Sequence, residues 1–220
     1  MKVRIELTYQ TPKGTKTTLR SDEMAAGEAM LIAEDLERSG RSKSITFYDS
    51  QEHTWSLKEI QKFMTEIHTE PHNVTVYFDG GFDIQTKRSG LGCVIYYEQD
   101  GKSYRLRKNA LVNELDTNNE AEYAALHLAI QELEILGVHH LPVTFIGDSQ
   151  VVINQLRDEW PCFEDVLSNW MDRIEAKLEE AGIQPEYEVV SRKKNKEADQ
   201  LASQALQEVE IMSTSEVQGK

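Results

Sequence analysis

The stretch that decides the fold reads Val74-Thr75-Val76-Tyr77-Phe78-Asp79-Gly80-Gly81. A short, mainly apolar run that ends in a glycine turn signal predicts a buried strand followed by a turn. Asp79 comes directly after the run, where a solvated acid is not expected. The two glycines behind it would let a backbone or a substrate approach closely. Taken alone, an ordinary Asp-Gly turn also explains this acid.

The residues that follow predict an α/β domain. Strands are predicted at 90–98, 103–107, 143–146 and 187–190, and helices at 117–136, 149–157, 164–181 and 195–208. Three adjacent strands followed by alternating helices and strands predict a mixed five-stranded sheet with helices on both faces. Sites in open α/β sheets lie at the carboxyl ends of strands.

The chain before this domain has a different pattern. Residues 1–70 alternate between short strands and helices, with Ser56 and Glu59 spaced as a capping box, and predict a small α+β domain. Its role is open: it could contact nucleic acid or an unknown protein partner, although a solvated hairpin is the favoured interpretation of its basic residues. The catalytic domain would span 73–208, and the polar segment 209–220 is predicted to be a flexible tail.

Composition excludes some classes of protein. The formal net charge of −14 argues against a protein that simply coats nucleic acid, because phosphate binding needs Lys and Arg. An enzyme that meets phosphate through bound metal is compatible with this charge. No apolar run is long enough to span a membrane, and no signal peptide is visible, so we expect a cytoplasmic protein. Cys93 and Cys162 are interpreted as reduced thiols.

Two acids of the long helix have different predicted roles. Thr117-Asn118-Asn119-Glu120 has the form of a capping box, so Glu120 should fold back on the helix start. Glu122 shares a face with Leu126, Ala129, Ile130 and Leu133, the core-facing stripe. An acid on a buried stripe is costly unless it is paired or bound to metal. Glu122 is therefore the candidate site residue, and an acid that merely reaches solvent at the helix end is the weaker alternative.

Asp148 and Asp199 complete the set of candidate acids. Asp148 follows the apolar run Val143–Gly147, and Asp199 lies early in the last helix. Each has an ordinary explanation, as a helix N-cap and as a favourable charge at a helix start, respectively. Two strand-end acids and two helical acids could nevertheless converge at one end of the sheet. Hard carboxylate ligands suit Mg²⁺ or Mn²⁺, and pairs of such ions promote phosphoryl displacement.

Four segments, in this order, resemble the ribonuclease H type I family. They are Val76–Gly81, Thr117–Tyr123, Gly147–Gln150 and Arg192–Ala202, and the resemblance covers about residues 73–208. The set is highly specific, although no single segment is. It implies a ribonuclease H-like fold and cleavage of the RNA strand of an RNA–DNA hybrid at a two-ion site, leaving a 5′-phosphate and a 3′-hydroxyl.

The resemblance also implies roles for individual residues. Asp79, Glu122, Asp148 and Asp199 would be the metal-binding catalytic acids. Thr117 would belong to a phosphate pocket, and Asn118, Asn119 and Gln150, with Ser149 beside them, would read the hybrid through its minor groove. The backbone at Gly80 and Gly81 would lie beside ribose 2′-hydroxyls, the groups that distinguish RNA from DNA.

Departures from the family leave alternatives open. Residues 191–198 lack the catalytic-loop His of some members, and Arg192 or Lys194 could stand near its place. The basic, Trp-rich protrusion of some bacterial members is replaced by a short acidic connection at 157–163. A proofreading-type exonuclease would need an acid where Gly81 stands, and a transposase-like enzyme would need Glu in place of Asp199. A catalytically weak or inactive fold that binds nucleic acid or a protein remains the main alternative.

Overall fold

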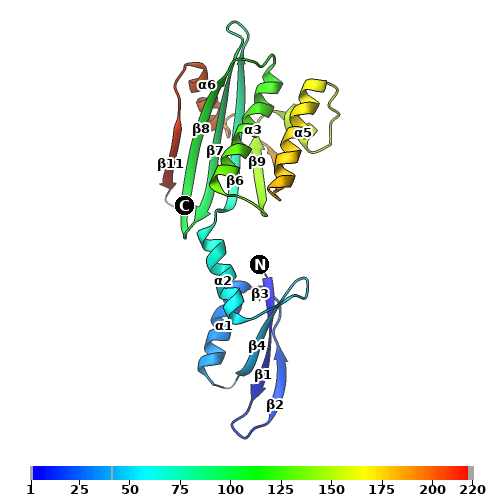
Figure 1. The fold of residues 1–220 in the computed structure, drawn as a ribbon, viewed down its shortest axis with the longest axis vertical. Coiled ribbons are helices and arrows are strands. Elements are labelled where there is room, and N and C mark those ends of the chain that lie inside the picture. Colours follow the sequence, from blue (N-terminus) through cyan, green and yellow to red (C-terminus); the bar gives the residue numbers. More distant parts are fainter. Residues whose placement is uncertain (1, 41, 218–220) are drawn as a thin grey trace. The chain divides into compact units, whose positions relative to one another are not determined.

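The protein is described here by a computed structural model, which covers residues 2–40 and 42–217 (Figure 1). Its contacts divide the chain into two compact units, residues 1–69 and 70–220. None of the described helices is long and apolar enough to cross a membrane. Each unit has its own hydrophobic core, so each is described separately.

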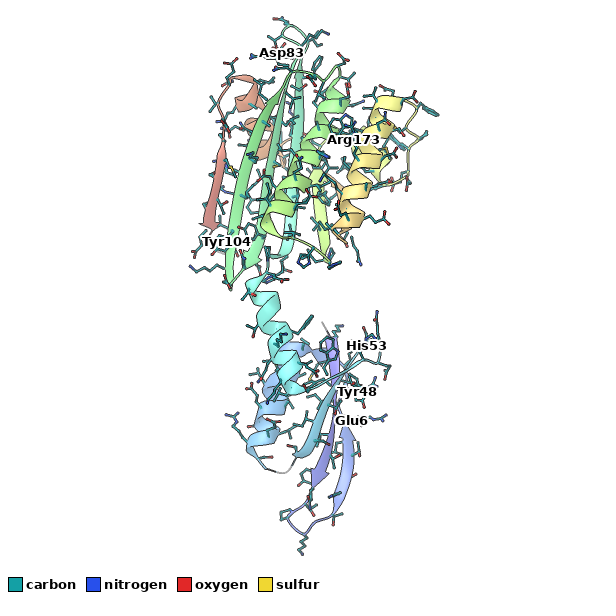
Figure 2. The ribbon with its side chains drawn as sticks, in the orientation of Figure 1. Glu6, Tyr48, His53, Asp83, Tyr104 and Arg173 are labelled. Atoms are coloured by element: carbon teal, nitrogen blue, oxygen red, sulfur yellow. The ribbon has the colours of Figure 1, made fainter. Side chains whose placement is uncertain are left out.

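The first unit is the predicted small α+β fold. Its elements are β1 (Lys2–Gln10), β2 (Lys16–Arg20), β3 (Met24–Ala25), α1 (Ala26–Arg38), β4 (Ser42–Asp49), β5 (Thr54–Trp55) and α2 (Leu57–Thr69). The strands pair antiparallel in the order β2-β1-β4-β5, and β3 pairs with β1. Val3, Ile5 and Leu7 alternate inward to the core, so Glu6 and Tyr48 lie on the other face (Figure 2).

The capping box of α2 forms as predicted. The backbone N–H of Ser56 donates to Glu59 Oε2 at 2.7 Å, and the N–H of Glu59 donates to Ser56 Oγ at 3.3 Å. These two bonds satisfy donors that the first turn of a helix leaves free.

The second unit is the predicted α/β fold. Its strands are β6 (His72–Asp83), β7 (Arg88–Gln99), β8 (Lys102–Val112), β9 (Pro142–Gly147), β10 (Gln184–Val189) and β11 (Met212–Val217), and its helices are α3 (Asn118–Leu136), α4 (Gln150–Leu156), α5 (Asp165–Glu180) and α6 (Lys196–Leu206). The sheet order is β10-β9-β6-β7-β8-β11. Strand β9 runs parallel to both β6 and β10, and the other pairs are antiparallel, so the sheet is mixed.

Two predictions for the end of the chain were wrong. The sheet has six strands rather than five, because β11 lies in the segment 209–220 that was predicted to be a flexible tail. Asn109 fixes the segment that precedes β11. Its Nδ2 donates to the carbonyl oxygens of Leu201 and Val209, and its Oδ1 accepts from the N–H of Ile211 at 2.7 Å. The side chains of β11 are almost all exposed. An edge strand that buries little shows no apolar alternation, so the sequence pattern missed it.

Glycines in the sheet allow helices to approach both faces closely. A Cβ on Gly80 would lie 2.1 Å from the backbone of Ala121 in α3. On the other face, a Cβ on Gly90 or Gly92 would lie 2.0 or 2.4 Å from the carbonyl oxygens of Ala202 and Ala198 in α6. Helices α3 and α5 lie on one face of the sheet and α6 on the other (Figure 1). This close packing brings α3 and α6 to the same stretch of β6.

Candidate metal centre

The strand that carries Asp79 differs from its prediction in a way that defines the site. Strand β6 does not turn after Asp79 but continues to Asp83, paired with β7 throughout. On its other side it pairs with β9 only as far as Tyr77. Asp79 therefore lies just beyond the last residue of β6 that pairs with β9. The carboxyl end of β9 lies beside it and leads into Asp148.

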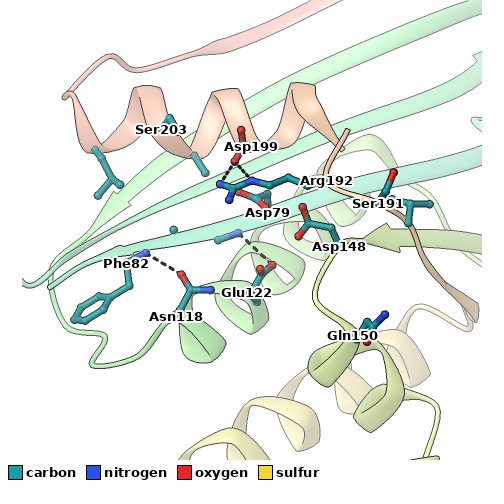
Figure 3. Close-up of a pocket in the computed structure, with 15 residues that line it drawn as sticks. Asp79, Phe82, Asn118, Glu122, Asp148, Gln150, Ser191, Arg192, Asp199 and Ser203 are labelled. Atoms are coloured by element: carbon teal, nitrogen blue, oxygen red, sulfur yellow. Dashed lines mark hydrogen bonds and ion pairs between the residues drawn. The ribbon is translucent and has the colours of Figure 1, made fainter. Parts of the chain in front are cut away.

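Three carboxylates from three separate elements meet at this edge. Asp79 of β6, Glu122 of α3 and Asp148 after β9 each offer an oxygen, and these oxygens all lie within 4.8 Å of one another (Figure 3). Asp79 and Glu122 are buried and Asp148 is half-buried. The N–H of Gly80 donates to Glu122 Oε2 at 3.3 Å, which helps to orient that carboxylate.

Asp199 lies in the same pocket but is bound to another partner. Its Oδ1 accepts from Arg192 Nη2 at 2.6 Å and from Arg192 Nε at 3.1 Å (Figure 3). The Arg192 side chain as a whole is 79% exposed, although its guanidinium pairs with Asp199. The structure thus groups three of the four candidate acids and places the fourth beside them in an ion pair.

Positive charge compensates the grouped acids only in part, through Arg192. Burial, followed by the charges of Asp148 and Asp199, raises the pKa of Asp79 to about 7. Burial and then the charge of Asp79 raise the pKa of Glu122 well above its ordinary value. Burial likewise raises the pKa of Asp148, against the lowering effect of Arg192. Asp148 Oδ2 is buried and accepts no hydrogen bond from any described residue. A cation would satisfy this oxygen and relieve the crowding of charges.

Glu120 caps the start of α3, as predicted. Glu120 accepts from the N–H of Asp116 at 2.9 Å, and its own N–H donates to Thr117 Oγ1 at 3.1 Å. Thr117 is the N-cap of α3, and Ser149 is the N-cap of α4 with a bond from the N–H of Val152. Both hydroxyls therefore have structural partners at the helix starts that border the site.

The predicted substrate contacts are distributed unevenly around the pocket. Its volume is about 600 Å³, and Gly80, Gly81, Asn118 and Gln150 line it. Asn118 Oδ1 accepts from the N–H of Phe82 at 3.3 Å (Figure 3). The other three predicted contacts are not among the lining residues: Thr117, Asn119 and Ser149.

Several residues that sequence reasoning did not assign to the site also line the pocket, among them Phe82 and Ser203. Phe82 follows Gly81 in the continued strand and was hidden by the predicted turn. Ser203 lies four residues after Asp199 on α6, and helical spacing could have placed it on the same face.

Comparison with known proteins agrees with this geometry. The model of the family described as reverse transcriptase-like matches residues 77–205. The uncharacterized protein YpeP of Bacillus subtilis (strain 168) is 44% identical over 208 residues, which cover 94% of this chain and 91% of YpeP.

Two solved structures share the fold of the second unit. Ribonuclease H1 of the archaeon Halobacterium salinarum is 29% identical with a TM-score of 0.54, and covers 61% of this chain and 98% of its own. LC11-RNase H1, obtained from compost by a metagenomic approach and solved with an RNA/DNA hybrid, is 26% identical with a TM-score of 0.54, and covers 62% of this chain and 98% of its own. The match to more than half of the sequence and the shared architecture show that this chain belongs to the reverse transcriptase-like family and carries a ribonuclease H fold.

Proposed function

We propose that the second unit is a metal-dependent endonuclease that hydrolyses the RNA strand of RNA–DNA hybrids to 5′-phosphate and 3′-hydroxyl products. The observation that carries the proposal is the meeting of Asp79, Glu122 and Asp148 within 4.8 Å. The solved LC11 complex with an RNA/DNA hybrid supports this class of substrate for a relative of the same fold.

The residues present fit divalent cations. The three acids offer hard oxygen ligands, the type that Mg²⁺ and Mn²⁺ prefer, and Asp148 Oδ2 is a buried acceptor without a donor among the described residues. We assign Asp79, Glu122 and Asp148 as ligands, with Asp199 completing the set. Bound at these carboxylates, such ions would supply a nucleophilic water and neutralise charge on the phosphate.

The chain's own groups would position the substrate. The backbone beside Gly80 and Gly81 is open to the pocket and would meet the 2′-hydroxyls of the RNA strand. Asn118 and Gln150 lie on either side of the acids in Figure 3 and would contact base edges in the minor groove. The exposed side chain of Arg192 lies at the rim of the pocket. Once a metal ion replaced Arg192 as the partner of Asp199, the guanidinium would contact a phosphate.

A cleavage assay tests the proposal. Asp148→Asn should abolish cleavage of a labelled hybrid in Mg²⁺ or Mn²⁺, because it removes a ligand charge while preserving side-chain size. Asp158→Asn, at an exposed loop position away from the pocket, is the matched control and should cut like the wild type. Duplex RNA and duplex DNA should remain intact. Equal hybrid cleavage by wild type and Asp148→Asn would end the proposal.

Two observations favour a second candidate function. Arg192 already neutralises Asp199, and the net charge of −14 opposes nucleic-acid binding. Both are compatible with a catalytically weak or inactive ribonuclease H-like protein that binds nucleic acid or a protein partner. Calorimetric titration with Mn²⁺ separates the two candidates, because an inactive remnant should bind the ion poorly.

A further inference from the structure

Helix α6 covers only part of its face of the sheet. It packs on Gly90 and Gly92 of β7, whereas Val94 and Tyr96 follow on the same face, beyond the helix start. A cleft of about 420 Å³ opens at this place, beneath the first turn of α6. Tyr77, Tyr96, Thr75 and Lys194 are among the residues that line it. This volume is within the range of roughly 300–1,000 Å³ that ligand pockets have.

The cleft is aromatic on its floor. The rings of Tyr77 and Tyr96 meet edge to face, with centroids 6.0 Å apart. Both side chains are half-buried, so each ring is held in place and still reaches solvent. Tyr96 donates its hydroxyl to Glu197 Oε2 at 3.0 Å, which fixes the second ring further. Rigid aromatic surfaces of this kind stack on nucleobases with little regard for sequence.

Positive side chains lie beside the cleft although the protein is acidic: Lys194 lines it, and Arg105 and Arg107 of β8 pair with the lining residue Glu197. Glu197 lies between Arg105 Nη1 at 3.2 Å and Arg107 Nε at 3.1 Å, so one carboxylate faces two guanidinium groups. Arg107 Nε is therefore taken by the ion pair with Glu197, and Arg105 Nε is buried without a hydrogen bond to any described residue. Lys194 adds a further positive charge at the rim. Lys194 is thus the positive group that a phosphate in the cleft would meet directly.

An acid on the β10 side of the cleft, Glu186, limits where a phosphate could lie. Glu186 of β10 is paired in register with Thr144, and Thr144 with Thr75, so these residues share this face of the sheet. The positive groups are on the opposite side of the tyrosines, on β8 and at the start of α6. An anionic strand would therefore follow the β7–β8 side of the cleft.

The cleft adjoins the candidate metal centre. Tyr77 precedes Asp79 by two residues on the same face of β6, which corresponds to about 7 Å along the strand. Asn195, at the start of α6, lines the cleft, and its Nδ2 donates to the carbonyl oxygen of Phe78 at 2.9 Å. Arg192, three residues earlier, lines the pocket of the acids. A nucleic-acid strand that left the acids and passed the turn at 192–195 would reach Tyr77 and Tyr96 over the length of about one nucleotide.

We propose that this cleft binds an unpaired nucleotide of the substrate, so that the protein prefers RNA–DNA hybrids that carry a single-stranded RNA extension over blunt hybrids. The inference rests on the proposed function for its substrate class. The cleft between α6 and the sheet suits a single base and its phosphate, whereas a paired duplex has no free base to place on Tyr77 and Tyr96.

Binding measured in EDTA, where a metal-dependent enzyme does not cut, tests the proposal. Fluorescence anisotropy of the full chain would compare a labelled blunt hybrid with the same hybrid carrying about six unpaired ribonucleotides at either end, a length within known single-strand site sizes. We expect the extended hybrid to bind roughly tenfold more tightly, as stacking of one base predicts. Equal affinity for blunt and both extended hybrids would overturn the proposal and leave a protein or a small molecule as the occupant.

Two matched pairs of variants locate the contact. Tyr96→Leu should abolish the preference for the extension, whereas Tyr96→Phe keeps the ring and should preserve it. Lys194→Ala should lower the salt dependence of binding by about one phosphate contact, whereas Lys193→Ala, which does not line the cleft, should leave it unchanged. A preference that survives both Tyr96→Leu and Lys194→Ala would overturn the assignment. Lys194 is exposed, so its variant remains informative if Tyr96→Leu fails to fold.

This outcome is separable from that of the cleavage assay. A blunt hybrid that is cut while extensions add no affinity would remove only the cleft proposal. Extended hybrids that bind through Tyr96 and Lys194 but are never cut would remove only the nuclease proposal.

Discussion

Gly80→Ala should damage both the stability and the metal affinity of the second unit. The added Cβ would lie 2.1 Å from the carbonyl carbon and oxygen of Ala121 and 2.3 Å from the nitrogen of Glu122, whereas ordinary contacts begin at 3.4 Å. These atoms belong to the backbone of α3, so no side chain can rotate away. The helix must retreat by about 1 Å, and overpacking of this kind costs roughly 1–3 kcal/mol.

The retreat would move the ligand as well as the helix. Glu122 is carried by the displaced turn and also accepts the hydrogen bond from the N–H of Gly80. Changes to groups that orient metal ligands typically lower metal affinity by about 10–100-fold. We therefore expect weaker Mn²⁺ binding by calorimetry, and a melting temperature lower by roughly 5 °C at about 2–4 °C per kcal/mol.

The neighbouring glycine provides a control for this argument. A Cβ on Gly81 would meet only Leu206 Cδ1, at 3.7 Å, which is an ordinary contact. Gly81→Ala should therefore unfold near the wild-type temperature and bind Mn²⁺ normally. Wild-type stability and Mn²⁺ affinity in Gly80→Ala would refute the claim that close packing of α3 on β6 positions Glu122.

Three further outcomes follow from the structure. Because the pKa of Asp79 is raised to about 7, this residue should lower the stability of the metal-free protein as pH rises from about 4 through 7. Asp79→Asn should remove this contribution, measured as the pH dependence of thermal melts in EDTA. Asn109→Ala leaves the N–H of Ile211 without its acceptor and should lower the free energy of unfolding by roughly 1–3 kcal/mol, whereas the exposed Asn113→Ala should change it little in urea titrations. Arg192→Ala removes a cation from beside the acids and should strengthen Mn²⁺ binding several-fold by calorimetry, whereas Lys193→Ala should not; unchanged affinity in Arg192→Ala would contradict the competition between Arg192 and metal.

Some features of the site could be predicted because local periodicity determines them. Helical spacing placed Glu122 among core-facing residues and Glu120 at the cap, and the structure shows both in these environments. The apolar run before Asp148 identified β9 in the same way. In each case the relevant neighbours lie within one turn or one strand of the residue concerned.

Other features depend on neighbours that are distant in the chain. The turn predicted after Asp79 was wrong because pairing with β7, which runs to Asp83, overrides the local glycine signal. The strand β11 was missed because its stability comes from β8 and from Asn109, about a hundred residues earlier. Periodicity within one segment carries no information about such partners.

The electrostatic state of the site is the property that most depends on tertiary structure. Asp79, Glu122 and Asp148 each have an ordinary local explanation, yet their pKa values rise because three elements bring them into one buried space. Folding without a cation therefore leaves carboxylates that resist ionisation, and among the four acids of the pocket the Arg192 guanidinium donates hydrogen bonds to Asp199. A chain with no use for metal could relieve this cost by replacing any one acid with an apolar residue. The presence of all three acids, with oxygens within 4.8 Å of one another, is thus easier to explain if a divalent ion supplies the missing charge.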